Sequence, residues 1–162
     1  MGIRETLNKR PRVAAAMTAG LLSVAAALFI WANKGVPERV TRAYYSDDDG
    51  KTFFDDGVDK IYPFDHDGKP AFRAYVYQCG KEKPFVHYLG RYTDKAKAQM
   101  AELMNNANDP EAAGELARLR NTAIEVKRPG EQQWVPLFSS AGETMTRHPI
   151  CADKSTARGL SP

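Results

Sequence analysis

The fold of this chain is decided by residues 72–92, FRAYVYQCGKEKPFVHYLGRY. Over residues 72–79 the side chains alternate between two faces as in a β-strand, one face carrying Phe72, Ala74 and Val76 and the other Arg73, Tyr75, Tyr77 and Cys79. After a polar loop, residues 85–92 are predicted to return as the antiparallel partner. Because both faces of this pair carry apolar or aromatic groups, we expect the pair at the centre of a sheet.

A second hairpin is predicted upstream, with strands at residues 40–45 and 52–54 around an aspartate-rich turn. Residues 46–53, SDDDGKTF, fit the pattern S-x-D-x-G-x-T-[WF]. The pattern resembles the Asp-box of sialidase-like propellers and other secreted β proteins, where it is a structural hairpin remote from chemistry. The matching residues are Ser46, Asp48, Gly50, Thr52 and Phe53. Since a propeller needs several blades of about 40 residues each, this single copy implies a well-made turn.

Two helices are predicted downstream of the central strands. Thr93 is a suitable N-cap for a helix over residues 94–106, and Asp109 for a helix over residues 110–121 that has proline at its first position. Apolar residues recur at helical spacing in both segments, so each helix is expected to pack one side on the sheet.

The rest of this region predicts short strands and loops. Strands are expected at residues 124–127 and 133–138, around a Pro-Gly turn. Residues 55–70 are rich in turn signals and are expected to be an irregular loop, and the chain beyond Ser139 is also expected to be loop-like. The predicted fold class is α+β: one N-terminal transmembrane helix, then a small, mostly antiparallel sheet domain with two helices.

The transmembrane prediction rests on residues 13–32, VAAAMTAGLLSVAAALFIWA, which carry no charge. Twenty helical residues span about 30 Å, the thickness of the hydrocarbon core of a bilayer. The basic residues before the stretch (Arg4, Lys9, Arg10 and Arg12) favour a cytoplasmic N-terminus and an extracytoplasmic C-terminal domain at the cell membrane. The alternative is a cleaved signal peptide, although the end of the stretch is bulky (Phe29, Ile30 and Trp31) where a cleavage site needs small residues.

The expected organisation follows from this signal-anchor. It is a cytoplasmic basic tail (1–12), a transmembrane helix (13–32), a stalk (33–43), an exported α+β domain (44–152) and a disordered tail (153–162). In an exported compartment, two cysteines usually pair. We therefore expect a disulfide between Cys79 and Cys151, which would stabilise the domain by on the order of 4 kcal/mol. Two unrelated buried thiols are the alternative.

Known catalytic, phosphate-binding and metal-binding motifs are missing from the sequence, so we expect no cofactor and no metal. The many aspartates between residues 47 and 67 invite a calcium site, but the spacing of an EF-hand loop is missing and such aspartates more often form turns. The three histidines lack zinc-ligand spacing. With 23 basic residues against 20 acidic ones, nucleic-acid binding has little electrostatic support.

A candidate partner surface is the tyrosine-rich face of the central strands, with Tyr75, Tyr77 and Tyr88. Tyrosine gives large contact area at low entropic cost and is enriched at interfaces. The alternative is that these rings belong to the core.

A wider resemblance covers most of residues 44–151. The segments YYSDDDGKTFF (44–54), PFDHDGKPA (63–71) and RAYVYQC (73–79), with YLGRYT (88–93) and the stretch from VKRPG to WVP (126–136), resemble uncharacterised single-span membrane-anchored proteins of planctomycete-type bacteria. The resemblance implies an anchored exported domain and implies no activity.

The function expected is that of a membrane-anchored cell-envelope protein whose exported domain binds another envelope protein and is not an enzyme. The alternative is an extracytoplasmic ligand- or glycan-binding domain, which could be hydrolytic. That alternative needs convergent carboxylates, for instance Asp55, Asp59 and Asp65.

Overall fold

The computed structural model describes residues 11–33, 40–106 and 108–162. The chain divides into two compact units, residues 1–39 and 40–162, and each is described by itself. The expected basic tail falls largely on residues 1–10, and most of the expected stalk on residues 34–39; both lie outside the described residues.

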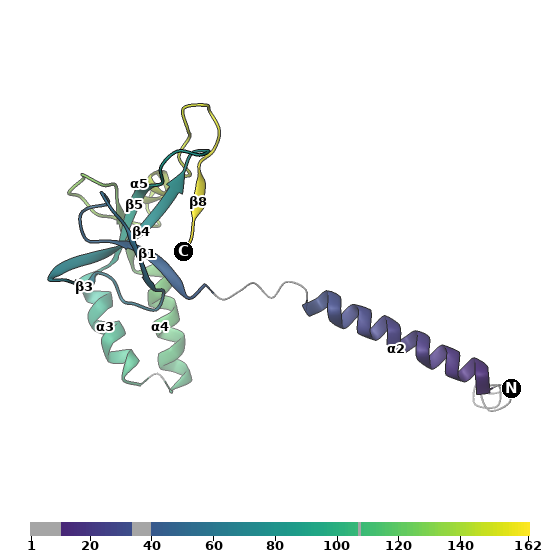
Figure 1. Cartoon of the computed structure of the whole chain (residues 1–162). Coiled ribbons are helices and arrows are strands. Elements are labelled where there is room, and N and C mark those ends of the chain that lie inside the picture. The colour runs from purple at the N-terminus through teal and green to yellow at the C-terminus, as the bar shows by residue number, and fades with distance from the viewer. Residues whose placement is uncertain (1–10, 34–39, 107) are drawn as a thin grey trace. The chain divides into compact units, whose positions relative to one another are not determined.

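In the described part of the first unit, residues 11–33 form helix α2 (Pro11–Asn33), over the stretch expected to cross the membrane (Figure 1). Several of its side chains are exposed, Leu21, Leu22 and Leu28 among them. When the described residues are searched for a helix of sufficient length and apolar character to cross a bilayer, none qualifies. The sequence prediction of a helix is thus confirmed here, and the prediction of a membrane span is not.

The second unit is built on an antiparallel sheet whose centre is the predicted pair, β4 (Lys69–Gln78) and β5 (Phe85–Tyr92). The order of strands is β2-β1-β4-β5-β6-β7, and β3 and β8 also pair with β4. The other strands are β1 (Arg42–Ser46), β2 (Phe54–Gly57), β3 (Phe64–His66), β6 (Ile124–Lys127), β7 (Val135–Pro136) and β8 (Arg158–Leu160). The mostly antiparallel α+β class is confirmed.

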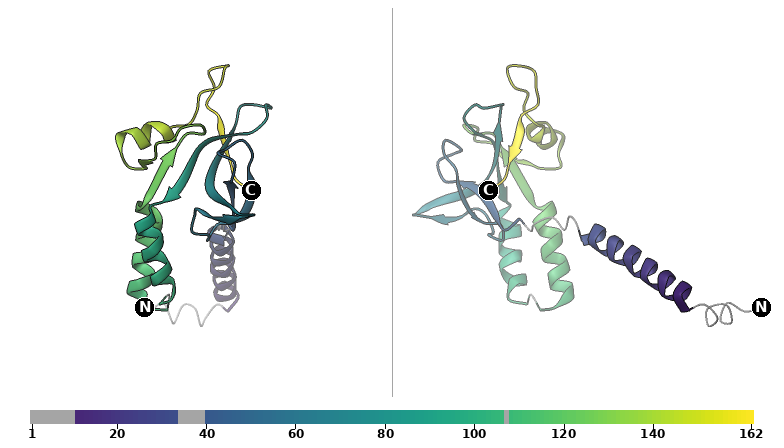
Figure 2. Two further views of the ribbon diagram at one scale, coloured as in Figure 1. Left: turned by 90° about the vertical axis from the view of Figure 1, so that its left-hand side faces the viewer. Right: turned by 45° about the vertical axis from the view of Figure 1, so that its right-hand side comes forward.

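Helices α3 (Asp94–Met104) and α4 (Pro110–Thr122) lie side by side beyond one end of the sheet (Figures 1 and 2). Thr93 and Asp109 cap them as predicted, accepting hydrogen bonds from backbone N–H groups of the first turns. Met100 of α3 and Leu119 of α4 are buried in one cluster with Tyr45 and Tyr92 of the sheet. Packing on this sheet face holds the helix pair in place.

The opposite face of the sheet is also covered. Its cluster centres on Leu89, which is 0% exposed, with Ala74, Val76 and Val86. Phe72 and Trp134 pack at its border, with ring centroids 5.2 Å apart. The central strands therefore have two buried faces, as the sequence predicted.

Three sequence predictions about loops are wrong. Residues 55–70 contain most of β2 and all of β3. The segment after Ser139 forms helix α5 (Ser140–Thr146), which Ser139 caps through its hydroxyl. Glycine lets α5 pack closely, because a Cβ on Gly142 would lie 2.2 Å from the carbonyl oxygen of Pro136. The described residues thus hold four helices, one more than the transmembrane helix and the two domain helices that the sequence predicted, and the additional helix is α5.

The third error concerns residues 153–162, predicted to be a disordered tail. They include β8, which pairs with β4 through Val76↔Leu160 and Tyr77↔Gly159, and a bridge joins Ile150 to Thr156. Ala157 is 2% exposed. The segment is ordered because Cys151 fixes its start against the sheet, so the compact unit runs from residue 40 to 162 and not from 44 to 152.

Candidate functional site

The predicted disulfide between Cys79 and Cys151 is present. It joins residues 72 positions apart, with the Cα atoms 5.7 Å from each other. Cys79 directly follows β4, and Cys151 lies between α5 and β8. The bond therefore ties the C-terminal segment, including β8, to the central strand.

The Asp-box-like residues form a closed turn between β1 and β2. The Asp48 carboxylate accepts hydrogen bonds from the Ser46 hydroxyl at 2.9 Å, and from the backbone N–H and hydroxyl of Thr52 at 2.9 and 2.6 Å. Burial alone would raise the pKa of Asp48, but these hydrogen bonds outweigh it and hold the pKa below its ordinary value. Phe53 packs edge-on against Tyr44, with ring centroids 5.0 Å apart. The hydrogen-bond partners of Asp48 all lie within the turn, while Ser46 also pairs with Phe72 of β4 and Gly50 lies close to Pro129, which fits a structural turn.

The next aspartate fastens this turn to the far side of the sheet. Asp49 accepts hydrogen bonds from the Lys127 ammonium at 2.5 Å and from the Gly130 N–H at 2.8 Å. Burial alone would raise the pKa of Asp49, yet the bonds from Lys127 and Gly130 lower it. The Lys127 side chain is only 9% exposed, so its charge depends on this carboxylate and on the Glu131 carbonyl at 2.8 Å.

Replacing Asp49 with alanine is expected to destabilise the domain by about 1–2 kcal/mol, because a largely buried ammonium loses its counter-charge. Lys127→Met removes the charge itself, so the double variant Asp49→Ala/Lys127→Met should cost less than the sum of the single changes, by about 1 kcal/mol. Urea unfolding of the four proteins measures this coupling. Strict additivity would show that the pair contributes nothing to the docking of the turn.

A buried histidine lies beneath the end of α5. His87 on β5 is 8% exposed and donates from Nε2 to the carbonyl oxygen of Arg147 at 3.0 Å. The rings of Tyr77 and Tyr88 flank it, with centroids 5.3 and 5.8 Å away. Burial lowers the pKa of His87 below its ordinary value of 6.5, the nearby charges of Arg128 and His148 add to that, and the Arg147 carbonyl opposes it.

This lowered pKa gives the stability of the domain an acid-sensitive component. Below pH 6.5 the unfolded chain takes up a proton on residue 87 that the folded chain does not, so stability falls with pH by at most about 1.4 kcal/mol per pH unit until the folded pKa is passed. His87→Gln should flatten this part of the profile, measured by urea unfolding from pH 7.5 to 5. His66→Gln, which leaves His87 in place, should keep it; equal slopes in the two variants would contradict the assignment.

Two of the three tyrosines predicted to form a partner surface, Tyr77 and Tyr88, are buried. Tyr77 and Tyr88 are 7% and 8% exposed, because α5 and the C-terminal segment cover them. Tyr75 stacks on Tyr88, with ring centroids 4.2 Å apart. The core interpretation is therefore correct for Tyr77 and Tyr88. Tyr75 and Tyr77, however, also contribute to the wall of a pocket.

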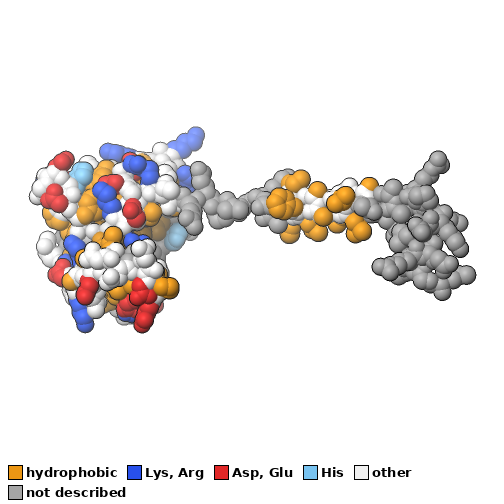
Figure 3. Space-filling model, turned by 90° about the horizontal axis from the view of Figure 1, so that it is seen from below, with side chains coloured by type: hydrophobic (Ala, Val, Ile, Leu, Met, Phe, Trp, Pro, Cys, Tyr) orange, Lys and Arg blue, Asp and Glu red, His pale blue; other side chains and the backbone are white. Residues whose placement is uncertain are grey.

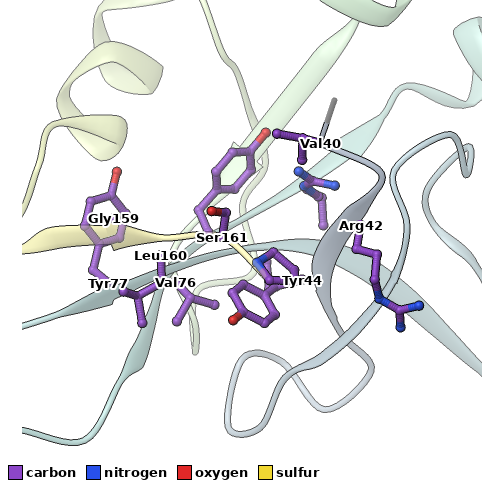
Figure 4. A pocket seen from close by; sticks show the side chains of 12 residues that line it. Val40, Arg42, Tyr44, Val76, Tyr77, Gly159, Leu160 and Ser161 are labelled. Atoms are coloured by element: carbon purple, nitrogen blue, oxygen red, sulfur yellow. The ribbon is translucent and has the colours of Figure 1, made fainter. Parts of the chain in front are cut away.

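That pocket, which we call the β4 notch, lies at the edge of β4 between β1 and β8 (Figure 4). Both strands pair with this edge: β1 as far as Tyr45↔Arg73, and β8 from Leu160↔Val76. Within the described sheet, Ala74 and Tyr75 therefore have no strand partner on this side. The notch has a volume of about 130 Å³ and is lined by Val40, Arg42, Tyr44, residues 73–77 of β4 and residues 159–162.

Two arginines, Arg42 and Arg73, contribute positive charge to the β4 notch, and they differ in whether a carboxylate neutralises them. Arg42 is paired with Asp55 through Nε and donates from Nη2 to the Asp55 carbonyl at 2.9 Å. Arg73 makes no ion pair with any carboxylate among the described residues; its Nη1 donates to the Tyr45 hydroxyl at 3.5 Å, and its Cζ lies 5.5 and 5.9 Å from the ring centroids of Tyr45 and Tyr75.

The tyrosines around Arg73 do not neutralise it. Burial raises the pKa of Tyr45 and of Tyr75 above the ordinary value of 10, even though Arg73 opposes the shift in both. Both phenols therefore stay uncharged at neutral pH. The β4 notch thus combines one unneutralised guanidinium with aromatic walls and two residues of β4 that lack a strand partner, an arrangement suited to binding an anionic group.

The carboxylates needed for a hydrolytic site do not form a described cluster. Asp55 is engaged by Arg42, and Asp65 accepts from the Gly68 N–H at 3.3 Å within its own hairpin. No group of three or more His, Cys, Asp or Glu side chains that could hold a metal ion is found in the part of the chain searched, residues 11–33, 40–106 and 108–162.

Sequence reasoning missed the role of Arg73, although a signal was present. Arg73 is the one charged residue on a strand face that otherwise carries Tyr75, Tyr77 and Cys79. A cation among aromatic residues on a half-buried face is unusual enough to mark a site. The second wall, from β8, carried no such signal.

Comparisons with known proteins add no assignment: no protein-family model, curated protein or solved structure matches the chain.

Proposed function

We propose that this chain is a non-enzymatic cell-envelope protein. Residues 13–32 would hold it in the cell membrane with the N-terminus in the cytoplasm, and the unit from Val40 to Pro162 would bind another envelope protein outside the cytoplasm. The resemblance to single-span proteins of planctomycete-type bacteria agrees with this proposal.

The membrane part of the proposal is supported by the uncharged sequence of residues 13–32 and by the surface of α2. Its described side chains are mostly hydrophobic (Figure 3), and Leu21 and Leu22 are 73% and 65% exposed. Exposed apolar surface on this scale is costly in water and marks a site of membrane or protein contact. The Cys79–Cys151 disulfide supports an oxidising compartment for the second unit.

The observation that carries the binding function is the β4 notch. It presents an unneutralised arginine beside an unpaired stretch of strand, and both features recognise peptides in known binding modes. On the face seen in Figure 3, acidic and basic side chains of the second unit are interspersed. Among the described side chains on this face there is thus no broad area of one charge sign to attract a partner, and the local β4 notch is the more specific feature.

The membrane proposal is tested by fractionating cells that produce the full chain. The protein is expected in the carbonate-washed membrane pellet, with Met1 retained and the second unit cleaved by protease added from outside. Leu22→Arg/Leu28→Arg should move it out of the pellet, since each arginine in a span costs about 2.5 kcal/mol or more. Recovery of the unaltered chain as a soluble species would refute the anchor, and a mature N-terminus near Asn33 would show a cleaved signal.

The binding proposal is tested by photocrosslinking in intact cells. A photoreactive residue replaces Tyr44 in the notch, and in a matched control it replaces Lys95, which is exposed on α3. Adducts with a second protein are expected from position 44 and not from position 95. No adduct at either position, or equal adducts at both, would contradict binding through this region.

A further inference from the structure

We propose that the β4 notch binds an acidic side chain of an extended peptide, held by Arg73. This inference rests on the proposed function, because it names the chemistry of the partner's segment that would enter the site.

The size of the notch limits what can enter it. Its volume of about 130 Å³ is close to the roughly 150 Å³ of a cavity that holds one benzene molecule. Pockets for drug-sized ligands and cofactors measure about 300–1,000 Å³. One side chain fits, whereas a nucleotide or a sugar chain does not.

The charge selects a carboxylate. The Arg73 guanidinium has no carboxylate partner among the described residues, and its aromatic neighbours stay uncharged. A guanidinium offers parallel N–H donors that match the two oxygens of a carboxylate. Arg42, on the opposite wall, is already occupied by Asp55. Of the two arginines, Arg73 is therefore the one available to a carboxylate in the notch.

The strand edge favours a peptide over a free acid. Between Arg73, which pairs with β1, and Val76, which pairs with β8, the edge of β4 is unpaired at Ala74 and Tyr75. Ser161 and Pro162, which follow β8, also line this gap, and Ala74 is 4% exposed. An entering segment can therefore hydrogen-bond to an unpaired peptide group here but cannot add a full strand. Backbone contacts at the edge and one acidic side chain in the pocket would then act together.

The apolar walls suit the stem of such a side chain. On one face of the sheet, Tyr44 of β1 and Leu160 of β8 border the pocket (Figure 4). On the other, Tyr75 and Tyr77 lie on the same face of β4 as Arg73. The methylene groups of Glu or Asp can lie against these rings while the carboxylate reaches Arg73. The walls come from three strands, so the site exists only when β8 is in place.

The test uses the full chain in detergent micelles and two capped pentapeptide libraries, identical except that the central residue is Glu in one and Gln in the other. The Glu library is expected to be retained about tenfold more strongly, the effect of about 1.4 kcal/mol from one charge-assisted interaction. Arg73→Gln should abolish the difference, and Arg73→Lys should keep part of it. Arg118→Gln, which removes an exposed arginine from α4, should leave it unchanged.

A second variant keeps the test decisive if Arg73→Gln fails to fold. Ser161 is exposed and lines the notch, so Ser161→Glu places a carboxylate of the chain's own beside Arg73 and should block retention of the Glu library. Ala152→Glu makes the same charge change at an exposed position outside the notch and should not block it.

Each outcome decides a separate point. Equal retention of the two libraries overturns the acidic specificity, even if crosslinks at position 44 support a protein partner. Displacement of the Glu library by free glutarate at concentrations equal to the peptide overturns the peptide requirement. Selective retention together with no crosslinked partner in cells would refute the proposed function and leave the notch chemistry standing.

Discussion

Replacing both cysteines with serine is expected to lower the free energy of unfolding of the second unit by about 2–5 kcal/mol. The disulfide closes a loop of more than seventy residues between Cys79 and Cys151, and its removal restores the entropy of that loop to the unfolded chain. Urea unfolding at pH 7.5 measures the loss. Adding dithiothreitol to the unaltered protein should give the same loss, and it should leave the Cys79→Ser/Cys151→Ser variant unaffected.

The loss should be uneven across the domain. The segment after Cys151 has few other anchors, chiefly Ala157 and the pairing of β8 with β4. Amide hydrogen exchange should therefore quicken first in residues 147–160, ahead of β5 and β6. Because β8 forms a wall of the β4 notch, the reduced protein should also lose its preference for the Glu library. Uniform exchange across the sheet would contradict this local role of the disulfide.

Leu89→Ala is expected to destabilise the domain by about 2–5 kcal/mol. Leu89 is 0% exposed at the centre of the cluster on the sheet face opposite α3 and α4. Truncation removes buried methyl groups and leaves a cavity that the central strands cannot close. The midpoint of urea unfolding measures the loss.

Phe138→Ala is the matched control for that measurement. It deletes a larger side chain, but Phe138 is 66% exposed, so the change should stay within about 0.5 kcal/mol. Equal losses from the two variants would mean that this face of the sheet is not packed as described.

The parts of the fold that sequence reasoning found are those whose signal is local. Alternation over residues 72–79 and 85–92 predicted β4 and β5, and the bounds of β5 and of β6 agree with the predicted residues. Thr93 and Asp109 located the starts of α3 and α4 through their capping chemistry. For each of these elements, the sequence pattern that predicts it lies within about ten consecutive residues.

The parts it missed depend on distant contacts. Helix α5 has small and polar residues and only seven of them, and it is held by the close approach of Gly142 to the Pro136 carbonyl. Strand β8 contains a glycine and three residues in all, so its pairing follows from the tether at Cys151. The notch needs residues near 42, 73 and 160 to meet at one edge, which periodicity in a single segment cannot reveal.

Two strands, β1 and β8, cover the same edge of β4, and this arrangement affects self-association of the protein. Were β8 to detach, five successive residues, 74–78, would become a bare ladder of peptide groups, open to the same stretch of a second molecule. Strand β8, held near β4 by the Cys79–Cys151 disulfide, thus protects this edge from pairing with a second molecule. The redox state of Cys79 and Cys151 would therefore affect aggregation in concentrated solution even where the domain stays folded.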